Sequence, residues 1–473
     1  MQGLTAVALD LGSTAIKAGL LTRDGTLTGI VSRPAPPVSG EGGRYESAAL
    51  AYAETADAVL AQCLAQTIER PPLGLCSQRS SFLLWERQSG KPVTPLISWQ
   101  DERGAAACAE LRGQEMQIRA LTGLPLTPYY FAPKLRVLLQ QNPKWRARLL
   151  SGEWLVGTLD TFLIWRWTHG AQHVTDASMA ARTLLLDVGS VRWSPLLCEL
   201  FAVPVQSLPQ VLPSAGSGLA LDNGLILQAS LGDQSAALLA SLEADRPQAM
   251  VNLGTGGFVA CPLPEGRAVL SGYLRTLVWQ DGAGRPHFAC EGTLNSIGVA
   301  LADYPAADCD PAELGSDDIY CLAEPSGLGA PYFRGDLGVC FSASVAHLPA
   351  ARIALLLQEA VIFRVARMLE EMQHAFGIER AYLAGGLSNL PCLQQGIARC
   401  APCAIFFLQQ PEAGLFGTAQ LAAGGYRPGW QAVPVDGGVA GAGLVEKFGR
   451  WKHWLEGLLA SGSTGSQGRA ISV

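Results

Sequence analysis

The chain has 473 residues, of which 49% are apolar and 16% charged, and its net charge is -6. At roughly 100–200 residues per domain this length predicts two to three domains, and the composition excludes a chain that is disordered throughout. The sequence has no Lys/Arg run of the kind that binds nucleic acid, and no apolar run reaches the ~18 residues of a membrane span. We therefore expect a cytoplasmic protein that binds neither nucleic acid nor a membrane.

The twelve cysteines are scattered through a long chain, which predicts buried thiols rather than a disulfide framework. Cys400 and Cys403 form a C-x-x-C without a second pair at zinc-binding spacing. We expect this pair to be structural; redox sensing is the weaker alternative.

The first elements are a strand, a turn and a second strand. An apolar strand ends at Asp10, Gly12-Ser13-Thr14 forms the turn, and Asp24-Gly25 predicts a hairpin turn into a third strand. Glycine and small hydroxyl residues let backbone N–H groups approach phosphate, although an ordinary β-turn is the alternative. Asp10 could hold Mg²⁺ or simply cap the turn.

The next elements alternate between helical and extended patterns. We expect helices over 48–66 and 135–150, a buried strand ending near Ser77, and a short strand near Leu225. That strand leads into Gly232-Asp233, at the start of an apolar helix. Asp233 is interpreted either as a helix N-cap or as a general base for an attacking hydroxyl.

The second half repeats the opening plan. Residues 249–261 again predict strand, turn and strand, with Gly254-Thr255-Gly256-Gly257 at the turn, which indicates an internal duplication. We place the boundary near 240–247, which gives lobes of 1–243 and 244–430 and an extension of 431–473. A helix over 351–376, a strand over 380–383 before Gly385-Gly386 and Asn389, a helix over 451–459 and a frayed end over 462–473 complete the expected elements.

Other chemistries find little support. The six histidines show no metal-binding spacing. The chain has neither the G-x-x-x-x-G-K-[ST] of a P-loop nor the G-x-S-x-G of a serine hydrolase.

In combination these motifs resemble the FGGY carbohydrate kinases over residues 4–425. The resemblance rests on motifs that occur in one order, namely Asp10-Leu-Gly-Ser-Thr, Trp99-Gln-Asp101-Glu-Arg103, Asp160-Thr161, Thr175-Asp176-Ala-Ser178, Gly232-Asp233-Gln234, Gly254-Thr-Gly, Gly385-Gly386-Leu-Ser-Asn and Leu415-Phe-Gly-Thr-Ala. It implies a duplicated α/β fold of the two-lobed actin/hexokinase (ribonuclease H-like) type with an interlobe cleft. The expected activity is phosphorylation of a small polyol or ketose with ATP and Mg²⁺, in a chain expected to form a homodimer. A non-catalytic ATP-binding switch of the same superfold is the alternative from another class.

The resemblance also implies roles for individual residues. Asp233 is the expected base and Asp10 the expected metal ligand. The acceptor is expected to contact Arg79, Ser80, Tyr129, Asp233 and Gln234. The nucleotide is expected to contact Gly12, Ser13, Thr14, Lys17, Gly254, Thr255, Gly256, Gly298, Gly385, Gly386 and Asn389.

Within the family the chain looks most like glycerol kinase, with departures. Glycerol kinases carry Glu where this chain has Ser80, which removes a hydrogen-bond acceptor for a substrate hydroxyl. The chain is also shorter through 299–320. Xylulokinases carry Met-His at Arg79-Ser80, yet Phe131-Ala-Pro-Lys134 looks xylulokinase-like, so a pentulose acceptor stays open.

Overall fold

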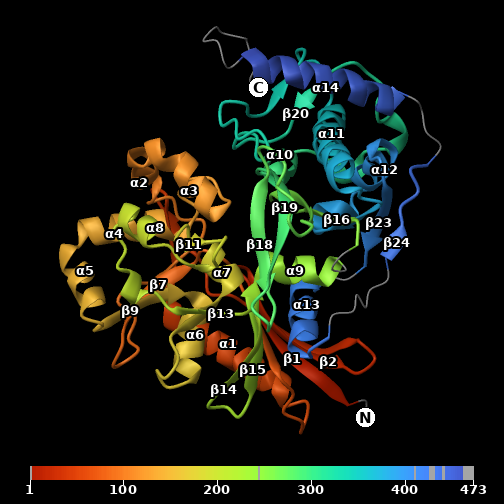
Figure 1. Ribbon diagram of the computed structural model, residues 1–473. Helices are drawn as coiled ribbons and strands as arrows, with labels where there is room; N and C mark the ends of the chain where they lie inside the picture. Colours follow the sequence, from red (N-terminus) through yellow and green to blue (C-terminus); the bar gives the residue numbers. More distant parts are fainter. Residues whose placement is uncertain (1–2, 243–245, 410–411, 426–431, 439–442, 462–473) are drawn as a thin grey trace. The chain divides into compact units, whose positions relative to one another are not determined.

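The protein is described here from a computed structural model that covers residues 3–242, 246–409, 412–425, 432–438 and 443–461 (Figure 1). The chain divides into two compact units. Of the described residues, unit 1 holds 3–241, 275–288 and 412–425, and unit 2 holds the remainder. Each unit is an α/β domain with its own sheet and core.

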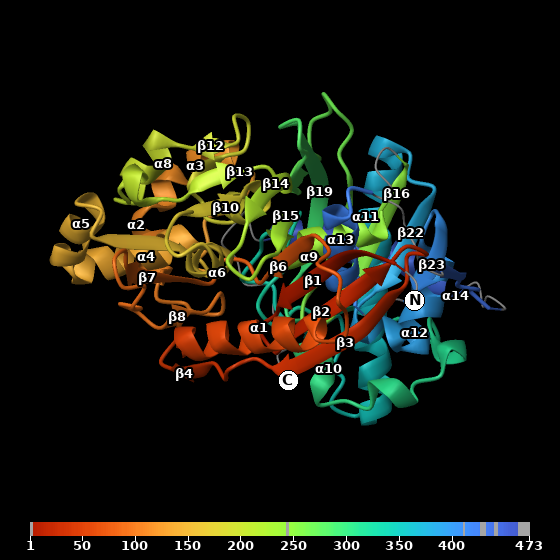
Figure 2. The same ribbon diagram turned by 90° about the horizontal axis from the view of Figure 1, so that it is seen from below.

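Unit 1 is built on a six-stranded sheet in the order β14-β15-β6-β1-β2-β3 (Figure 2). β1 pairs antiparallel with β2 and parallel with β6, and β6 pairs parallel with β15. The strands are β1 (Leu4–Leu11), β2 (Ala15–Thr22), β3 (Leu27–Pro34), β6 (Leu73–Ser77), β14 (Ala215–Ala220) and β15 (Ile226–Gly232).

Three helices complete this core. They are α1 (Ala49–Leu64), α9 (Asp233–Ser241) and α13 (Ala413–Ala422). Gly74 of β6 leaves room for Thr418 of α13, since a Cβ there would meet the Thr418 backbone. The last 14 described residues of unit 1 therefore return to the sheet with which the chain begins.

A second sheet of unit 1, in the order β4-β5-β8-β7-β9, carries the smaller helices. Phe82, Phe131 and Phe201 lie in its core. Two further two-stranded sheets, β10-β13 and β11-β12, belong to the same part of unit 1. The elements of this part are β4 (Ser39–Glu41), β5 (Arg44–Ser47), β7 (Phe82–Glu86), β8 (Leu96–Ile97), α2 (Ala105–Glu110), η1 (Arg112–Gln114), α3 (Glu115–Thr122), α4 (Phe131–Gln141), α5 (Pro143–Leu150), β9 (Trp154–Thr158), α6 (Leu159–Trp167), β10 (Val174–Asp176), α7 (Ala177–Ala181), β11 (Leu186–Asp187), β12 (Arg192–Trp193), α8 (Pro195–Leu200), η2 (Val205–Ser207) and β13 (Gln210–Leu212).

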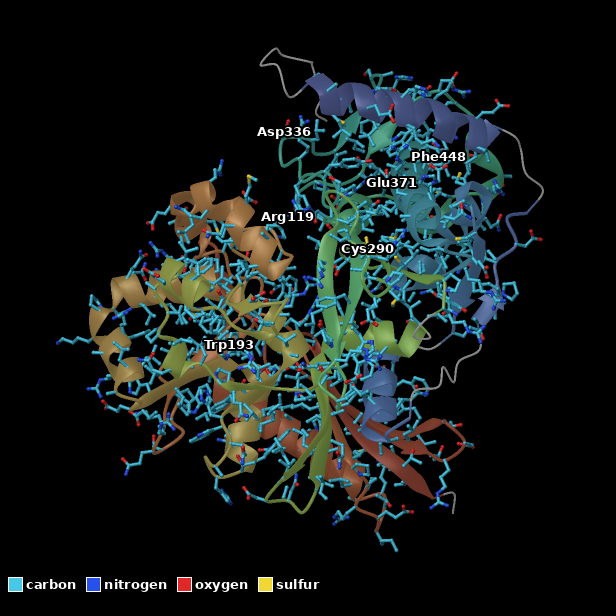
Figure 3. All side chains as sticks on the ribbon, viewed as in Figure 1. Arg119, Trp193, Cys290, Asp336, Glu371 and Phe448 are labelled. Atoms are coloured by element: carbon cyan, nitrogen blue, oxygen red, sulfur yellow. The ribbon has the colours of Figure 1, made fainter. Side chains whose placement is uncertain are left out.

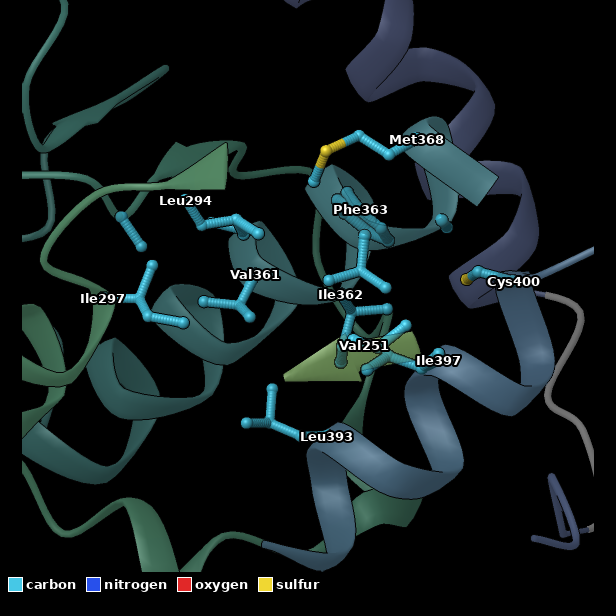
Figure 4. Close-up of a cluster of buried hydrophobic side chains, with 14 of the residues drawn as sticks. Val251, Leu294, Ile297, Val361, Ile362, Phe363, Met368, Leu393, Ile397 and Cys400 are labelled. Atoms are coloured by element: carbon cyan, nitrogen blue, oxygen red, sulfur yellow. The ribbon is translucent and has the colours of Figure 1, made fainter. Parts of the chain in front are cut away.

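Unit 2 is built on the sheet β18-β19-β17-β16-β22-β23-β24, of which β18 after its first residue and the start of β19 fall within 275–288, the segment grouped with unit 1. The Phe448 side chain lies in the hydrophobic core of unit 2 (Figure 3). In the core of unit 2, Ile362 of the long helix α11 (Ala350–Phe376) lies beside Val251 of the sheet and Ile397 of α12 (Figure 4). The neighbouring Val361 lies on the side of Leu294 and Ile297. The other elements are β16 (Gln248–Leu253), β17 (Gly257–Pro262), β18 (Leu274–Gln280), β19 (Pro286–Leu294), α10 (Ile297–Ala302), η3 (Ala306–Asp308), η4 (Pro311–Glu313), β20 (Cys321–Leu322), β21 (Cys340–Phe341), β22 (Arg380–Ala384), η5 (Gly386–Asn389), α12 (Pro391–Cys400), β23 (Ala404–Leu408), β24 (Ala432–Pro434) and α14 (Gly443–Ser461).

The two units repeat one topology, as the sequence predicts. β16 pairs antiparallel with β17 and parallel with β22, which then pairs parallel with β23. The order β19-β17-β16-β22-β23 in unit 2 thus matches β3-β2-β1-β6-β15 in unit 1. The predicted internal duplication is confirmed.

Two of the predicted helices differ from those observed. The single helix expected over 135–150 is wrong, because α4 and α5 meet at Asn142-Pro143. Proline has no N–H to continue the helix and disfavours helical backbone at the preceding residue. The last helix is longer than the predicted 451–459, since α14 already begins at Gly443.

Two other expectations fall outside the described residues. The predicted boundary at 243–244 and the frayed end at 462–473 both lie there. The expected lobe limits and the cleft between the lobes stay predictions.

Candidate active site

Two carboxylates lie at the carboxyl edge of the parallel strands of unit 1. In the register of β1, β6 and β15, Asp10 and Leu231 both stand beside Cys76, and Gly232 stands beside Ser77. Asp233 follows at once, as the first residue of α9. In α/β sheets ligands bind outside the carboxyl ends of strands, so this edge is where a site is expected.

Asp10 is held in an environment that favours its neutral form. Burial, together with the nearby Asp233 carboxylate, raises its pKa to about 7, and a hydrogen bond from Cys76 and the charge of Lys17 offset only part of this. Its Oδ1 is shielded from solvent and accepts no hydrogen bond from the described residues. A cation would satisfy this oxygen, so Asp10 fits a Mg²⁺ ligand.

The first turn lies between Asp10 and Lys17, which are partners across the β1–β2 hairpin. A Cβ on Gly12 would lie 2.7 Å from the Ala15 carbonyl oxygen, so the turn requires glycine. The Tyr52 hydroxyl donates to the Gly12 carbonyl at 2.6 Å. Thr14 at the tip is exposed and Ser13 is half-buried, which leaves the turn accessible.

Sequence reasoning missed the residues that come from the far end of unit 1. Lys17 Nζ lies 2.8 Å from both carboxylate oxygens of Glu412, the residue before α13. Gly414 lies close to the Asp10 carboxylate and to the Asp233 backbone, because a Cβ there would stand 3.7 Å from Asp10 Oδ2 and 3.8 Å from the Asp233 carbonyl oxygen. No local motif signals a contact across 395 residues.

Arg79 and Asp233 form an ion pair at this edge. Nε of Arg79 lies 3.3 Å from Asp233 Oδ1, but its N–H is not directed for a hydrogen bond. The arginine side chain is 4% exposed, whereas that of the aspartate is 44% exposed. The carboxylate is therefore flanked by a buried cation and still accessible to a ligand.

The other residues expected to contact the acceptor divide into two groups. Gln234 and Tyr129 are half-buried, and the Tyr129 ring centroid lies 5.6 Å from that of Trp99. Ser80, by contrast, is buried, and its hydroxyl donates to the Arg182 carbonyl at 3.0 Å. Its contact with an acceptor stays a prediction.

Buried Lys134 supports the backbone beside Ser80. Its Nζ donates to the Ser80 carbonyl at 3.2 Å and to the Ser98 carbonyl at 2.9 Å. Burial lowers its pKa to about 7. The sequence indicates Lys134 only as part of the xylulokinase-like segment Phe131-Ala-Pro-Lys134 and does not predict this supporting role.

The second turn lies in unit 2, between β16 and β17. Gly254 N–H donates to the Gly256 carbonyl at 2.8 Å, and Gly298 N–H donates to the Thr255 carbonyl at 2.9 Å. A Cβ on Gly298 would lie 2.8 Å from the Thr255 α-carbon. The structure thus brings the predicted Gly298 directly beneath the turn, whose residues Thr255 and Gly256 are exposed.

A third glycine segment follows β22 in the same unit. Gly385 has φ +89° and packs against Asn252 and the Leu253 carbonyl, where a side chain would collide. Asn389 is exposed and donates from Nδ2 to the Gly386 carbonyl at 3.0 Å. These residues stand at the carboxyl end of β22, beside the strand that leads to the second turn.

A separate cavity of about 660 Å³ lies in unit 1, lined by Trp165, Arg166, His169 and Asp222 among others. It includes none of the predicted site residues. In the described part of the chain, no three His, Cys, Asp or Glu side chains gather as a metal cluster, and no helix is both long and apolar enough to cross a membrane.

All twelve cysteines are free thiols. Nine of them are buried, in line with the buried thiols that the sequence predicts, whereas Cys108, Cys309 and Cys403 are half-buried.

Comparison with known proteins identifies the family. Residues 5–238 match the N-terminal domain of the FGGY family of carbohydrate kinases, and residues 249–426 match its C-terminal domain. The chain belongs to this family. It is therefore a kinase that transfers phosphate from ATP to an alcohol group of a sugar or polyol.

Individual relatives agree with this assignment. The kinase is 30% identical to glycerol kinase of Azotobacter vinelandii over 93% of this chain and 89% of that protein. It is 33% identical to glycerol kinase of Halorhodospira halophila over 70% of each chain.

Solved structures share the fold. Plasmodium falciparum glycerol kinase with ADP superposes with a TM-score of 0.82 at 20% identity, covering 95% of this chain and 98% of that one. Xylulose kinase from Rhodospirillum rubrum gives a TM-score of 0.80 at 20% identity, with coverage of 96% and 98%. The α/β two-unit architecture of a sugar kinase is thus confirmed.

Proposed function

We propose that unit 1 binds a small polyol of glycerol size and that Asp233 takes the proton from its attacking hydroxyl. The observation that supports this proposal is the half-exposed Asp233 carboxylate, which pairs with buried Arg79 and lies near enough to Asp10 to affect its pKa. A positioned carboxylate of this kind suits general base catalysis of phosphoryl transfer.

The nucleotide has two candidate sets of contacts. In unit 1 the backbone of Gly12, Ser13 and Thr14 would hold phosphate oxygens, with Lys17 as a nearby cation. In unit 2 the second turn would hold phosphate with Gly254, Thr255, Gly256 and Gly298, and Gly385, Gly386 and Asn389 would contact the rest of the nucleotide. The P. falciparum relative is described with ADP, which supports a nucleotide site in this fold.

Asp10 would hold the magnesium ion that accompanies ATP. The buried Oδ1, which accepts no hydrogen bond from any residue that the structure describes, supports this role. When bound, the ion would neutralise charge on the phosphate oxygens.

For the acceptor, Arg79, Tyr129 and Gln234 would bind the hydroxyl groups, with Ser80 beneath them. The relatives at about 30% identity are named glycerol kinases, which favours a polyol over a pentulose. The buried Ser80 leaves this kinase without the carboxylate that glycerol kinases carry there, so we expect a broader range of acceptors. Cytoplasmic location and a homodimeric assembly stay predictions.

ADP release with a panel of acceptors tests the proposal. Glycerol and other three- to four-carbon polyols should stimulate release more than D-xylulose and other pentuloses. A preference for pentuloses would overturn the acceptor assignment, and release that ignores every acceptor would overturn the proposed phosphoryl transfer.

A further inference from the structure

A buried hydrogen-bond chain leads to the residue before Asp233. The Ser178 hydroxyl of α7 accepts the Gly232 N–H at 2.9 Å and donates to Asp176 Oδ1 at 3.1 Å. Asp176 and Ser178 are 2% and 1% exposed. The last amide of β15 is therefore bound to a neighbouring helix through a single hydroxyl.

Asp176 is itself fixed by several donors. Its carboxylate accepts the N–H groups of Ser178 and Met179 at 2.8 and 2.9 Å, as the N-cap of α7. The Ser214 hydroxyl donates to Oδ2 at 2.6 Å, and the Ser214 hydroxyl in turn accepts the Gln280 N–H at 3.1 Å. A buried network in which every member is bonded is rigid, so it fixes the Ser178 hydroxyl in direction as well as in place.

The junction between β15 and α9, which this hydrogen-bond chain holds, is also restricted by its other neighbours. A Cβ on Gly232 would lie 2.6 Å from Arg79 Cδ and 3.5 Å from Met179 Sδ. The Gly232 backbone thus lies between the arginine that pairs with Asp233 and the helix that carries Ser178. Rotation of this peptide would swing the Asp233 side chain away from its present direction.

We propose that Ser178, supported by Asp176, is a positioning residue that sets the direction of the Asp233 carboxylate through the Gly232 amide. This inference rests on the proposed role of Asp233 as the base. It assigns a role to the Thr175-Asp176-Ala-Ser178 motif, which among the described residues forms no hydrogen bond with the side chain of Asp10 or Asp233 or with either glycine turn.

Ser178→Ala tests the proposal, with Ser235→Ala as the matched control. Ser235 is also 1% exposed and lies two residues after Asp233, but its hydroxyl has no hydrogen-bond partner among the described residues. Because a misplacement of about 1 Å can cost about 10²-fold in rate, Ser178→Ala should lower kcat by roughly 10- to 100-fold with the KM for ATP unchanged. Ser235→Ala should leave kcat within about twofold, since it removes no hydrogen bond.

The double variant with Asp233→Asn separates positioning from general stability. If Ser178 acts through Asp233, adding Ser178→Ala to Asp233→Asn should not lower the residual turnover further. An additive loss, or a normal kcat in Ser178→Ala beside an inactive Asp233→Asn, would overturn the positioning role alone. Near-normal turnover of Asp233→Asn would instead overturn the proposed base and the inference with it.

Two conservative variants keep the test decisive if Ser178→Ala does not fold. Ser178→Thr keeps the hydroxyl and should restore most of kcat. Ser178→Cys keeps the volume but offers a weak acceptor, so it should show the loss expected of alanine. Equal kcat in the Thr and Cys variants would contradict the proposal.

Discussion

Arg79 crosses the α-carbon of Gly232 and brings its Nε to 3.3 Å from Oδ1 of Asp233. Only a glycine at 232 allows this path, because a Cβ would lie within 2.7 Å of the arginine side chain. The carboxylate is held from its buried side, and its exposed side stays open to an acceptor.

Arg79→Ala should raise the KM for the acceptor more than the KM for ATP. Hydrogen bonds to charged groups contribute about 1.5–3 kcal/mol, so we expect the acceptor KM to rise about 10- to 100-fold while the KM for ATP changes little. Steady-state kinetics with each substrate varied in turn measures both. Equal rises would indicate that Arg79 serves only as a structural partner of Asp233.

Asp10→Asn should stabilise the free protein at neutral and alkaline pH. Burial raises the pKa of Asp10 from 3.8 to about 7, so between these values the unfolded chain loses a proton that the folded chain keeps. Folding stability from this group is therefore full below about pH 4 and is lost as the pH rises to about 7. Without Mg²⁺ or nucleotide, the Tm of the variant should match wild type near pH 4 and exceed it at pH 8; a constant difference would contradict this assignment.

The same carboxylate predicts a pH-dependent magnesium requirement. Mg²⁺ binds the ionised form, so the concentration that gives half-maximal activity should rise about tenfold for each pH unit below about 7. Activity titrated with Mg²⁺ at fixed ATP, at pH 6 and pH 8, measures this. The requirement should be the same at both pH values if Asp10 takes no part in metal binding.

Substitutions of Lys17 and of Glu412 should have different effects on the KM for ATP. Lys17→Met removes a cation beside the first turn and should raise the KM for ATP about 10-fold, as expected for the loss of a charge-assisted contact. Glu412→Gln removes the competing carboxylate 2.8 Å away and should leave this KM unchanged or lower it. If both variants raise it equally, the ion pair matters for the position of α13 rather than for phosphate.

Gly298→Ala should disturb the second turn. The added methyl would lie 2.8 Å from the Thr255 α-carbon and 2.9 Å from the Gly254 carbonyl oxygen, so the turn must shift. We expect a rise of about 10-fold or more in the KM for ATP, since misplaced phosphate contacts cost this much. Gly335→Ala is the control in the same unit, because no atom of the described chain lies within 4 Å of its added methyl.

Much of this site follows from local sequence, because strand ends and glycine turns have local signatures. Asp10 before Gly12 and Asp233 after Gly232 are visible as an acid beside a turn, and the repeated topology explains why such turns occur twice. The Asn142-Pro143 break has a local signature as well, because proline cannot continue a helix, but the prediction of one helix over 135–150 overlooked it.

Contacts between residues far apart in the sequence could not be predicted in the same way. Glu412 reaches Lys17 and Gly414 reaches Asp10 only because α13 packs back on the first strands. Lys447, fully buried against Glu359 and Asp317, likewise looks like a surface lysine until α14 is placed on α11. Such positions depend on tertiary packing, which neither hydrophobic periodicity nor a local motif can predict.

Turnover of Asp233→Asn tests the central claim most directly. Loss of a general base should lower kcat by at least ~10²-fold, because general base catalysis contributes about 10²–10⁴. ATP binding, measured by equilibrium titration, should stay close to wild type. Near-normal acceptor phosphorylation by this variant would contradict the account, because no other carboxylate described at this edge is as exposed as Asp233.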